Sequence, residues 1–209
     1  MSLRLWDEHA VPRLADRALR NPDLDGLRAR VCAGLSGRVL EIGFGSALNV
    51  RSYPAEVTGV TAIEPSDVAW RLGESRRRQA AVPIERGGLD GQRLDLPDAS
   101  HDAALVTFSL CTIPDAALAL REVRRVVRTG GTLHVLEHGR ADTESVRRWQ
   151  RRLEPLQRAT SAGCHLTRDV PKMVVENGWR WEDLESFALP GPAVARPWTY
   201  VHLGRATTA

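Results

Sequence analysis

A short apolar segment enclosed by glycines constrains the fold of this chain more than any other feature. Residues 38–42 read RVLEI, with Gly37 before them and Gly43 and Gly45 after them. The run is too short for a typical helix and has the composition of a buried strand. The glycines that follow let the backbone turn sharply and let a ligand lie against bare main chain. The segment therefore predicts a strand that leads into a ligand-binding turn.

Further apolar segments alternate with helical patterns along the chain. Strands are predicted at residues 57–63, 102–108 and 132–136, and a helix over 116–127 is predicted to end at Gly130 and Gly131. Strands that read as nearly continuous apolar runs between helices indicate a parallel sheet buried on both faces. The predicted fold is therefore α/β and doubly wound, with right-handed crossovers.

The two ends of the chain depart from this alternation. Residues 3–33 read as helical, with a break at Asn21 and Pro22. Helices are also predicted at 144–160 and at 169–177, where Asp169 is the expected N-cap. Two final strands are predicted near 180–187 and 198–203. The parallel sheet is thus expected to end in a pair of late strands.

Composition excludes several classes of protein. The 209 residues are 43% hydrophobic and 26% charged, which is near the globular average and excludes wholesale disorder. No apolar stretch approaches the roughly 18 residues that cross a bilayer, and residues 1–8 lack the apolar core of a signal peptide. The three cysteines, Cys32, Cys111 and Cys164, are scattered without a CxxC pair, so neither a disulfide framework nor a zinc cluster is expected. We expect a cytoplasmic protein with no metal site.

The charge distribution argues against a nucleic-acid partner. The net charge is +3, and arginine carries almost all of the positive charge because Lys172 is the only lysine. Arginine clusters such as residues 76–78 stand close to Glu and Asp, as they do on solvated helix faces. No nucleic-acid groove is therefore predicted.

A second acidic position accompanies the glycine turn. Glu64 ends the second predicted strand, about twenty residues after Gly43, where a carboxylate can accept hydrogen bonds from both hydroxyls of a ribose. A nicotinamide or flavin site is disfavoured because Leu48 occupies the third position of G-x-G-x-x-G/A. An S-adenosylmethionine site needs an acid two residues before the first glycine and a small residue two after the second. Glu41 and Ala47 meet these needs.

Two longer motifs resemble a known enzyme family. Residues 94–102 (LDLPDASHD) are similar to L-P-F-P-D-G-S-F-D, and residues 120–131 (LREVRRVVRTGG) are similar to L-R-E-x-x-R-V-L-R-P-G-G. Both motifs are typical of class I S-adenosylmethionine-dependent methyltransferases of type 11, the group that includes the ubiquinone-biosynthesis methyltransferases. Residues 136–139 and 163–168 resemble a smaller branch that includes thiol-methylating, membrane-associated enzymes. The first likeness covers residues 35–140.

The resemblance implies a fold and a division of the chain. The fold would be a seven-stranded, mostly parallel, Rossmann-like sheet with an antiparallel last strand. Residues 1–209 would form a single methyltransferase domain. Within it, residues 1–34 would be an N-terminal helical lid, 35–137 the cofactor-binding core, and 138–209 the substrate-side helices and the final strand pair.

The resemblance also assigns cofactor-binding positions. The methionine part of S-adenosylmethionine would lie on the glycine turn, with the ribose and then the adenine beyond it. The implied residues are Glu41, Gly43, Gly45 and Ala47 at the methionine part, Glu64 at the ribose hydroxyls, Pro65 and Ser66 beside the adenine, Asp90 at the adenine amino group, Gly91 at the adenine ring, and Ser109 and Leu110 at the methionine side.

Candidates on the acceptor side are fewer. His138 ends the strand near 132–136, beside the crevice in which such sheets bind ligands, and is the candidate catalytic residue. A structural histidine bonded to backbone is the alternative for this position. His165 with Cys164 is a second candidate pair. Cys111 and Cys164 are expected to be small buried residues, since no neighbour in sequence lowers the pKa of either thiol.

Three other residues receive structural assignments. His101 stands where the family usually has phenylalanine and is expected at the surface. Trp149 and Trp198 are expected to fill the core, with a wall of an apolar substrate pocket as the alternative.

The resulting functional expectation is transfer of a methyl group to a small, fairly apolar acceptor at O, S, N or C, with S-adenosylhomocysteine as the product. The partner would be a small molecule, because no N-P-P-Y or D-P-P-Y sequence of the nucleic-acid amino-methylating enzymes follows the strand at 102–108. Two alternatives stay open. One is a non-catalytic S-adenosylmethionine-binding sensor or regulator, and the other, disfavoured by Leu48, is a dinucleotide oxidoreductase.

Overall fold

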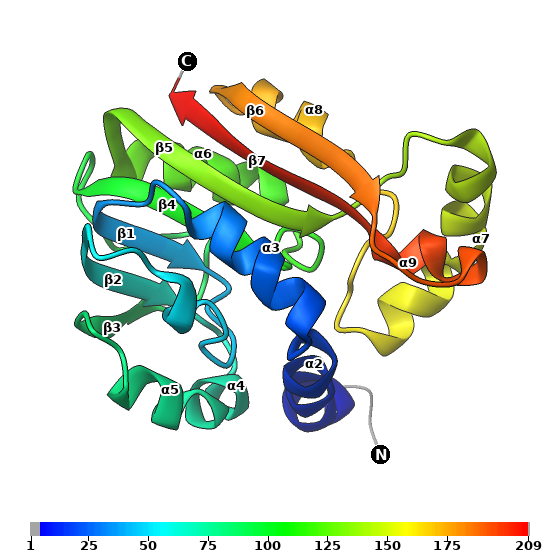
Figure 1. Cartoon of the computed structure of the whole chain (residues 1–209), viewed down its shortest axis with the longest axis horizontal. Helices are drawn as coiled ribbons and strands as arrows, with labels where there is room; N and C mark the ends of the chain where they lie inside the picture. Colours follow the sequence, from blue (N-terminus) through cyan, green and yellow to red (C-terminus); the bar gives the residue numbers. More distant parts are fainter. Residues whose placement is uncertain (1–4, 209) are drawn as a thin grey trace.

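A seven-stranded sheet organises the chain, of which the computed structural model describes residues 5–208 (Figure 1). The sheet order is β3-β2-β1-β4-β5-β7-β6. The first five strands pair in parallel, and β7 runs antiparallel to both β5 and β6. This arrangement confirms the predicted mostly parallel sheet with an antiparallel last strand. The strands are β1 (Gly37–Ile42), β2 (Val57–Ile63), β3 (Ile84–Gly88), β4 (His101–Thr107), β5 (Val127–His138), β6 (Trp179–Ala188) and β7 (Tyr200–Thr208).

Helices cover both faces of this sheet. In Figure 1, α3 lies in front of the strands, and α6 and α8 lie behind them. The longer helical elements are α2 (Val11–Leu19), α3 (Pro22–Cys32), α6 (Ala116–Val126), α7 (Glu144–Thr160) and α8 (Val170–Glu176). The shorter ones are η1 (Trp6–Ala10), η2 (Val50–Ser52), α4 (Asp67–Leu72), α5 (Glu74–Arg78), η3 (Ala193–Ala195) and α9 (Arg196–Thr199).

The two-residue period of the strands divides the apolar side chains between two cores. In β1, Leu40 and Ile42 belong to the core that includes Leu120 of α6, whereas Val39 belongs to the core that includes Leu27 of α3. Because successive side chains of a strand point to opposite faces, one apolar strand supplies both cores. This explains why the central strands read as continuous apolar runs.

Most predicted elements are confirmed, several of them at the predicted bounds. The strand at 57–63 and the helix at 144–160 match β2 and α7, and Asp169 caps α8 by accepting a hydrogen bond from Lys172 N. Asn21 caps α3 by accepting from the N–H of Asp23 and is followed by a proline at the first helical position. Residues 1–4 lie outside the described residues. They include the first two residues of the helix predicted over 3–33 and the first half of the segment 1–8, which was compared with a signal peptide.

The region between β2 and β4 was less predictable. The strand β3 and the helices α4 and α5 are additional to the elements expected from the sequence. β3 is an edge strand with the sequence IERGG, which has little apolar periodicity. The prediction that α6 ends at the glycine pair was wrong: α6 ends at Val126, and β5 already begins at Val127. No described helix combines the length and apolar character that crossing a membrane requires.

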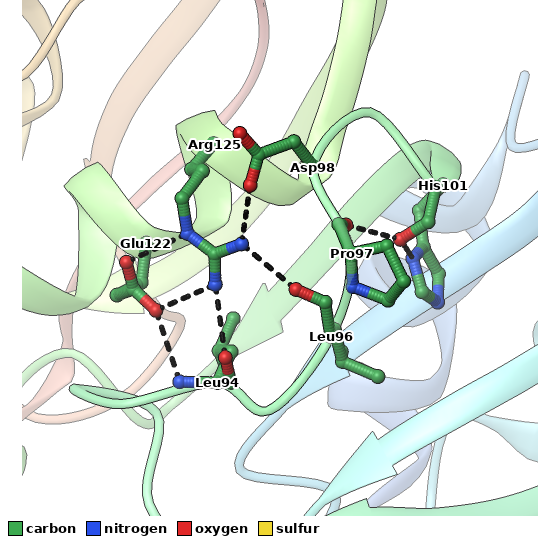
Figure 2. A network of polar contacts seen from close by, with 8 residues as sticks. Leu94, Leu96, Pro97, Asp98, His101, Glu122 and Arg125 are labelled. Atoms are coloured by element: carbon green, nitrogen blue, oxygen red, sulfur yellow. Dashed lines mark hydrogen bonds and ion pairs between the residues drawn. The ribbon is translucent and has the colours of Figure 1, made fainter.

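The loop before β4 is held by Arg125 of α6, as Figure 2 shows. The guanidinium donates hydrogen bonds to the carbonyl oxygens of Leu96 (2.8 Å) and Leu94 (2.9 Å), and to the carboxylates of Asp98 (2.7 Å) and Glu122 (2.9 Å). Glu122 in turn accepts from Leu94 N at 3.0 Å. The acidic and basic residues of the motif at 120–131 therefore anchor the motif at 94–102.

The predicted surface position of His101, which Figure 2 also labels, was wrong. His101 begins β4 and is buried, with its Nε2 2.9 Å from Thr61 Oγ1 and its Nδ1 3.0 Å from Ser100 Oγ. Burial lowers the pKa of the imidazole. A neutral histidine can satisfy two hydroxyls at once, which lets it replace an aromatic residue in the sheet.

Replacing Arg125 tests the anchoring role of the guanidinium. Arg125→Ala should lower the free energy of unfolding by about 2–3 kcal/mol, because two backbone carbonyls and two carboxylates lose a charged donor. Arg125→Lys should recover only part of this loss, since an ammonium group cannot reproduce the planar fork. Urea unfolding measures both. Arg121→Ala, on the same helix, removes one exposed hydrogen bond to Asn177 and is the control. Equal losses in Arg121→Ala and Arg125→Ala would refute the role.

Candidate active site

The carboxyl ends of the parallel strands open on a cavity of about 860 Å³. Such an edge is where open α/β sheets bind ligands, and the volume lies in the range of small-molecule sites, about 300–1,000 Å³. The cavity also contacts η1 and α2, so the N-terminal helices form one of its walls. The sheet side is lined by residues 42–46, 63–69, 89–92, 107–109 and 112–114.

The glycine turn after β1 has the backbone conformation that the sequence predicted. Gly43 and Gly45 have φ of +70° and +59°, in the left-handed region that favours glycine. A Cβ on Gly43 would lie 1.9 Å from Ser109 Oγ, so a side chain there has no room. Ala47 also has a positive φ of +64°, in the region that favours glycine. Ala47 is buried and does not itself line the cavity.

Glu64 lies at the cavity, directly after β2. Its two carboxylate oxygens accept hydrogen bonds from Gly45 N (2.6 Å) and Ser66 N (2.7 Å). Burial raises the pKa of this carboxyl, although the two N–H donors and Arg86 oppose the shift. Arg86 of β3 also donates two hydrogen bonds to the backbone carbonyl of Glu64. The carboxylate is thus held at the junction of the glycine turn and the start of α4.

The residues expected around an adenine line the same cavity. Pro65 and Ser66 follow Glu64, and Asp90 and Gly91 approach from the loop after β3. Asp90 is exposed and accepts hydrogen bonds from the backbone and side-chain nitrogens of Gln92, each at 2.9 Å. Leu89, which sequence reasoning assigned no role, adds an exposed apolar side chain to this wall. The four predicted residues therefore come together beside an apolar surface.

Glu41 lies behind the glycine turn. Its carboxylate is fully buried behind the turn, where it accepts hydrogen bonds from Asn49 Nδ2 (2.9 Å) and from the Tyr53 hydroxyl, and it does not line the cavity. Burial raises the pKa of Glu41 to about 7, against the lowering effect of these donors. Asn49, which does line the cavity, stands between Glu41 and the open space.

Ser109 and Leu110 are positioned by a carboxylate that sequence reasoning missed. Glu137 of β5 is fully buried, and its Oε1 accepts from the backbone N–H groups of Ser109 (2.5 Å) and Leu110 (2.8 Å). Burial raises the pKa of Glu137 to about 7. Ser109 lines the cavity, whereas Leu110 is buried away from it. Phe108, which also lines the cavity, has an unfavourable positive φ of +51°.

A buried arginine is the second functional candidate that the sequence did not reveal. Arg28 of α3 is 2% exposed and lines the cavity. Among the described residues, its ion pair is with Asp25 and is long at 3.4 Å, and its Nε has no hydrogen-bond partner. Burial lowers the pKa of the guanidinium. A buried cation with spare donors is a ready partner for an anionic ligand group.

The N-terminal helices are tied to the glycine turn by Asp16 of α2. Its Oδ1 accepts from Ser46 Oγ (2.7 Å) and from Arg76 of α5 (2.9 Å), and Arg76 also donates to the Ser46 carbonyl (2.7 Å). Hydrogen bonds from Ser46 and Arg76 lower the pKa of Asp16 against the effect of burial. The wall formed by η1 and α2 is therefore fixed to the turn that it faces.

The candidates on the acceptor side do not reach the cavity. His138 and His165 are absent from the lining formed by residues 5–208; Nδ1 of His165 instead contacts Glu154 Oε1 at 2.7 Å. The predictions for the two tryptophans were wrong, because Trp149 is 55% and Trp198 is 41% exposed and neither lines the cavity. Apolar residues that do line the cavity include Ile113, Pro114, Ala162, Val11 and Pro12.

His138 instead contacts a cysteine. Its Nδ1 lies 3.9 Å from Sγ of Cys164, and both residues are buried. Cys111 and Cys164 are both buried, as expected. Contacts with Cys111 and His138, which are distant in sequence, lower the thiol pKa of Cys164 against the effect of burial. Burial opposes charge on His138 as well, but the contact with Cys164 raises the imidazole pKa. The tertiary structure thus brings the Cys164 thiol against the His138 imidazole.

The sheet order and the cavity at its carboxyl edge define a Rossmann-like, ligand-binding α/β protein. A family described as "Methyltransferase domain" matches residues 40–155, which is more than half of the chain. The chain belongs to this methyltransferase family, as the motifs at 94–102 and 120–131 predicted.

Relatives with assigned activities include two kinds of methyltransferase. Thiol S-methyltransferase TMT1B of Homo sapiens is 32% identical over 161 residues, which cover 73% of this chain and 61% of that protein. Ubiquinone/menaquinone biosynthesis C-methyltransferase UbiE of Caulobacter vibrioides is 32% identical over 156 residues, covering 68% and 52%. The chain therefore spans about half to three fifths of the length of these relatives.

A solved structure supports the fold. The crystal structure of an S-adenosylmethionine-dependent methyltransferase from Thermotoga maritima, described as a possible histamine N-methyltransferase, matches this chain with a TM-score of 0.69 and 20% identity. The match covers 100% of both chains. At this identity the likeness establishes the Rossmann-like methyltransferase fold.

The buried carboxyl of Glu41 makes stability depend on pH. Its pKa is about 7 in the folded chain and 4.5 in the reference state, so the folded state holds a proton that the unfolded state releases between these values. Stability should therefore fall as pH rises through this window. Glu41→Gln should be more stable than the wild type by on the order of 2 kcal/mol at pH 8, with little difference at pH 4.

Urea unfolding of the free protein at both pH values measures this effect. Glu56→Gln, at an exposed position, is the matched control. Glu137, whose pKa is also raised to about 7, should leave some pH dependence in Glu41→Gln. If the free energy of unfolding changed with pH in the same way in the wild type and in Glu41→Gln, the raised pKa of Glu41 would be contradicted.

Proposed function

We propose that this chain is an S-adenosylmethionine-dependent enzyme that methylates the sulfur of a small, fairly apolar thiol. The observation that carries the proposal is the placement of Glu64 in the cavity, held by the N–H groups of Gly45 and Ser66. An ionised carboxylate has about four acceptor sites, so two remain for the hydroxyls of a ribose. The residues present therefore fit the sugar of the cofactor.

Arg28 fits the other end of the same molecule. S-adenosylmethionine carries an α-carboxylate on its methionine part, and the buried guanidinium with an unpartnered Nε can pair with it. Asn49 lies on the cavity between this region and Glu41, and we propose that Glu41 acts on the cofactor amino group through Asn49 or a water molecule. Gly43 and Gly45 leave space for the methionine chain.

The remaining cofactor contacts follow from the lining of the cavity. Asp90 would accept from the adenine amino group, and Gly91 would approach the ring edge, with Leu89 and Pro65 as apolar neighbours. Ser109 would line the methionine side, held there by Glu137. Leu110 and Ala47 would act by shaping the backbone, since both are buried away from the cavity.

The bound cofactor supplies an activated methyl group on a sulfonium, so the protein has to align the acceptor and exclude water. Alignment of this kind can lower a barrier by about 7–11 kcal/mol. The helices η1 and α2, tied down through Asp16, would cover the cavity as the N-terminal lid. The acceptor sulfur would form the new bond to carbon, its proton would go to solvent, and S-adenosylhomocysteine would remain.

A thiol is favoured among the possible acceptors. We assign the lining residues Ile113, Pro114, Ala162, Val11 and Pro12 to the acceptor side. This acceptor-side wall is apolar and contains no general base. A thiol that ionises in water needs no such base, which suits this wall. The likeness to the human thiol S-methyltransferase points the same way. His138 as a catalytic residue stays a prediction, because the imidazole does not line the cavity.

The alternative of a non-catalytic binding protein is less well supported, because the relatives compared above are named for turnover. A cytoplasmic location and a small-molecule partner remain part of the proposal.

Turnover on a matched acceptor panel tests the proposed function. With labelled S-adenosylmethionine, an alkyl thiol should be methylated at least about tenfold faster than a phenol or a quinol of similar size, since sulfur is intrinsically the stronger nucleophile. Mass spectrometry of the extracted product identifies the methylated atom. Faster transfer to a quinol carbon would overturn the assignment of a thiol acceptor. If no acceptor were methylated, the proposed methyltransferase activity itself would be overturned.

Cofactor binding can be divided between the two ends of the cavity. Glu64→Ala should weaken binding of both S-adenosylhomocysteine and methylthioadenosine by more than about 1 kcal/mol, because both ligands contain the ribose. Arg28→Met should weaken S-adenosylhomocysteine by about 2 kcal/mol and leave methylthioadenosine unchanged, because only the former has a carboxylate. Isothermal titration calorimetry measures all four affinities.

The control for this pair is Glu56→Ala, which removes an exposed carboxylate outside the cavity. If Arg28→Met weakened the binding of both ligands equally, Arg28 would not be the residue that binds the carboxylate. If Glu64→Ala left both affinities unchanged, Glu64 would not bind the ribose.

A further inference from the structure

Three side chains with metal-binding atoms meet behind the acceptor-side wall. Cys111 comes from the loop between β4 and α6, His138 ends β5, and Cys164 lies in the loop between α7 and α8. Their ligand atoms all lie within 4.8 Å of one another, with Cys164 Sγ 3.9 Å from His138 Nδ1. All three residues are buried. Three segments distant in sequence therefore deliver two thiols and an imidazole to one point.

We propose that Cys111 Sγ, Cys164 Sγ and His138 Nδ1 bind one zinc ion, with the fourth position taken by water or another exogenous ligand. Two sulfurs and one imidazole nitrogen are the donor set that zinc accepts, and a site with three protein ligands and one open position is an established type. The scattered cysteines, from which no metal site was expected, would thus form one only after folding brings them to His138.

The distances suit this ion. Zinc–sulfur bonds of about 2.3 Å and zinc–nitrogen bonds of about 2.05 Å give a tetrahedron whose ligand atoms are about 3.5–3.8 Å apart. The sulfur–nitrogen distance of 3.9 Å is within a few tenths of an ångström of this value. The upper limit of 4.8 Å on the other pairs requires at most about 1 Å of contraction. Rotation of buried side chains can provide such a shift.

The surrounding charges favour a bound cation. Two thiolates would balance the two positive charges of zinc, so the loaded site would be neutral in the interior. Glu137 adjoins His138 in β5, and its Oε2 is buried without a hydrogen-bond partner among the described residues. Glu137 also interacts electrostatically with both His138 and Cys164. It is therefore the candidate acceptor for a zinc-bound water.

The ion would hold in place two loops that supply residues to the cavity lining. The loop that carries Cys111 also supplies Ser109, Thr112 and Ile113 to the lining, and the loop that carries Cys164 supplies Ala162. Without metal, these loops are joined by a hydrogen bond from His165 N to Cys111 O (2.8 Å) and by Arg168, which donates to Ile113 O (2.6 Å). A shared ion would lock both loops to the end of β5.

Metal analysis of the purified, full-length chain tests the site without any methyl acceptor. After incubation with zinc sulfate and exhaustive dialysis, the wild type should retain about one zinc per chain. Cobalt(II) loading should produce thiolate-to-metal charge-transfer bands together with the visible absorption of a tetrahedral site. Cys111→Ala, Cys164→Ala and His138→Ala should each retain at least about tenfold less zinc. Cys32→Ala, which removes the third buried cysteine from α3, should retain the full amount.

Several results would overturn the proposal. One is a folded wild type without retained zinc or cobalt bands, and a second is a Cys111–Cys164 disulfide mapped by mass spectrometry in protein kept under reducing conditions. Equal metal content in all the variants would refute the three ligands. If a variant fails to fold, the cobalt spectrum of the wild type still decides the question. Cofactor binding is measured separately, so failure of the metal site is distinguishable from failure of the proposed enzyme.

Discussion

The parallel pairing of the first five strands is the constraint on which the rest of the structure depends. Because β1 pairs in parallel with β2 and β4, the chain leaves all three strands at the same edge of the sheet. Gly43, Glu64 and Ser109, far apart in sequence, meet there. Hydrogen bonds then lock them together: Gly45 N donates to Glu64, and Ser109 Oγ donates to Gly43 O at 3.3 Å. The cavity is a direct consequence of strand direction.

Buried carboxylates give this edge its electrostatic character. Glu41, Glu64 and Glu137 lie at or behind the ends of three strands, and burial raises the pKa of each. Backbone N–H groups, an amide and a phenol offset part of the cost of keeping these charges away from water. A ligand with a sulfonium and an ammonium group would offset more of it. Arg28 would then serve the one negative group of the same ligand.

The family motifs hold loops in place more than they contact a ligand. Glu122 and Arg125 anchor the segment before β4, and Arg168 of the late motif donates to the carbonyls of Ile113 and Pro114 beside the cavity. Sequence reasoning recognised these motifs but could not assign the contacts, because each joins segments more than 25 residues apart. The contact of His138 was out of reach of sequence reasoning for the same reason. The strand end was predicted, but the partner, Cys164, comes from another loop.

By itself the sequence determined six of the seven strands, the helix over 144–160, the glycine turn and the acid that closes β2, because period, capping and a positive φ are properties of neighbouring residues. Only the tertiary structure decided what depends on segments crossing in space. It buried His101, exposed Trp149, brought Arg28 to the cavity, and joined two cysteines to a histidine. Side-chain environment is set by whichever distant elements pack nearby, and local sequence does not encode that choice residue by residue.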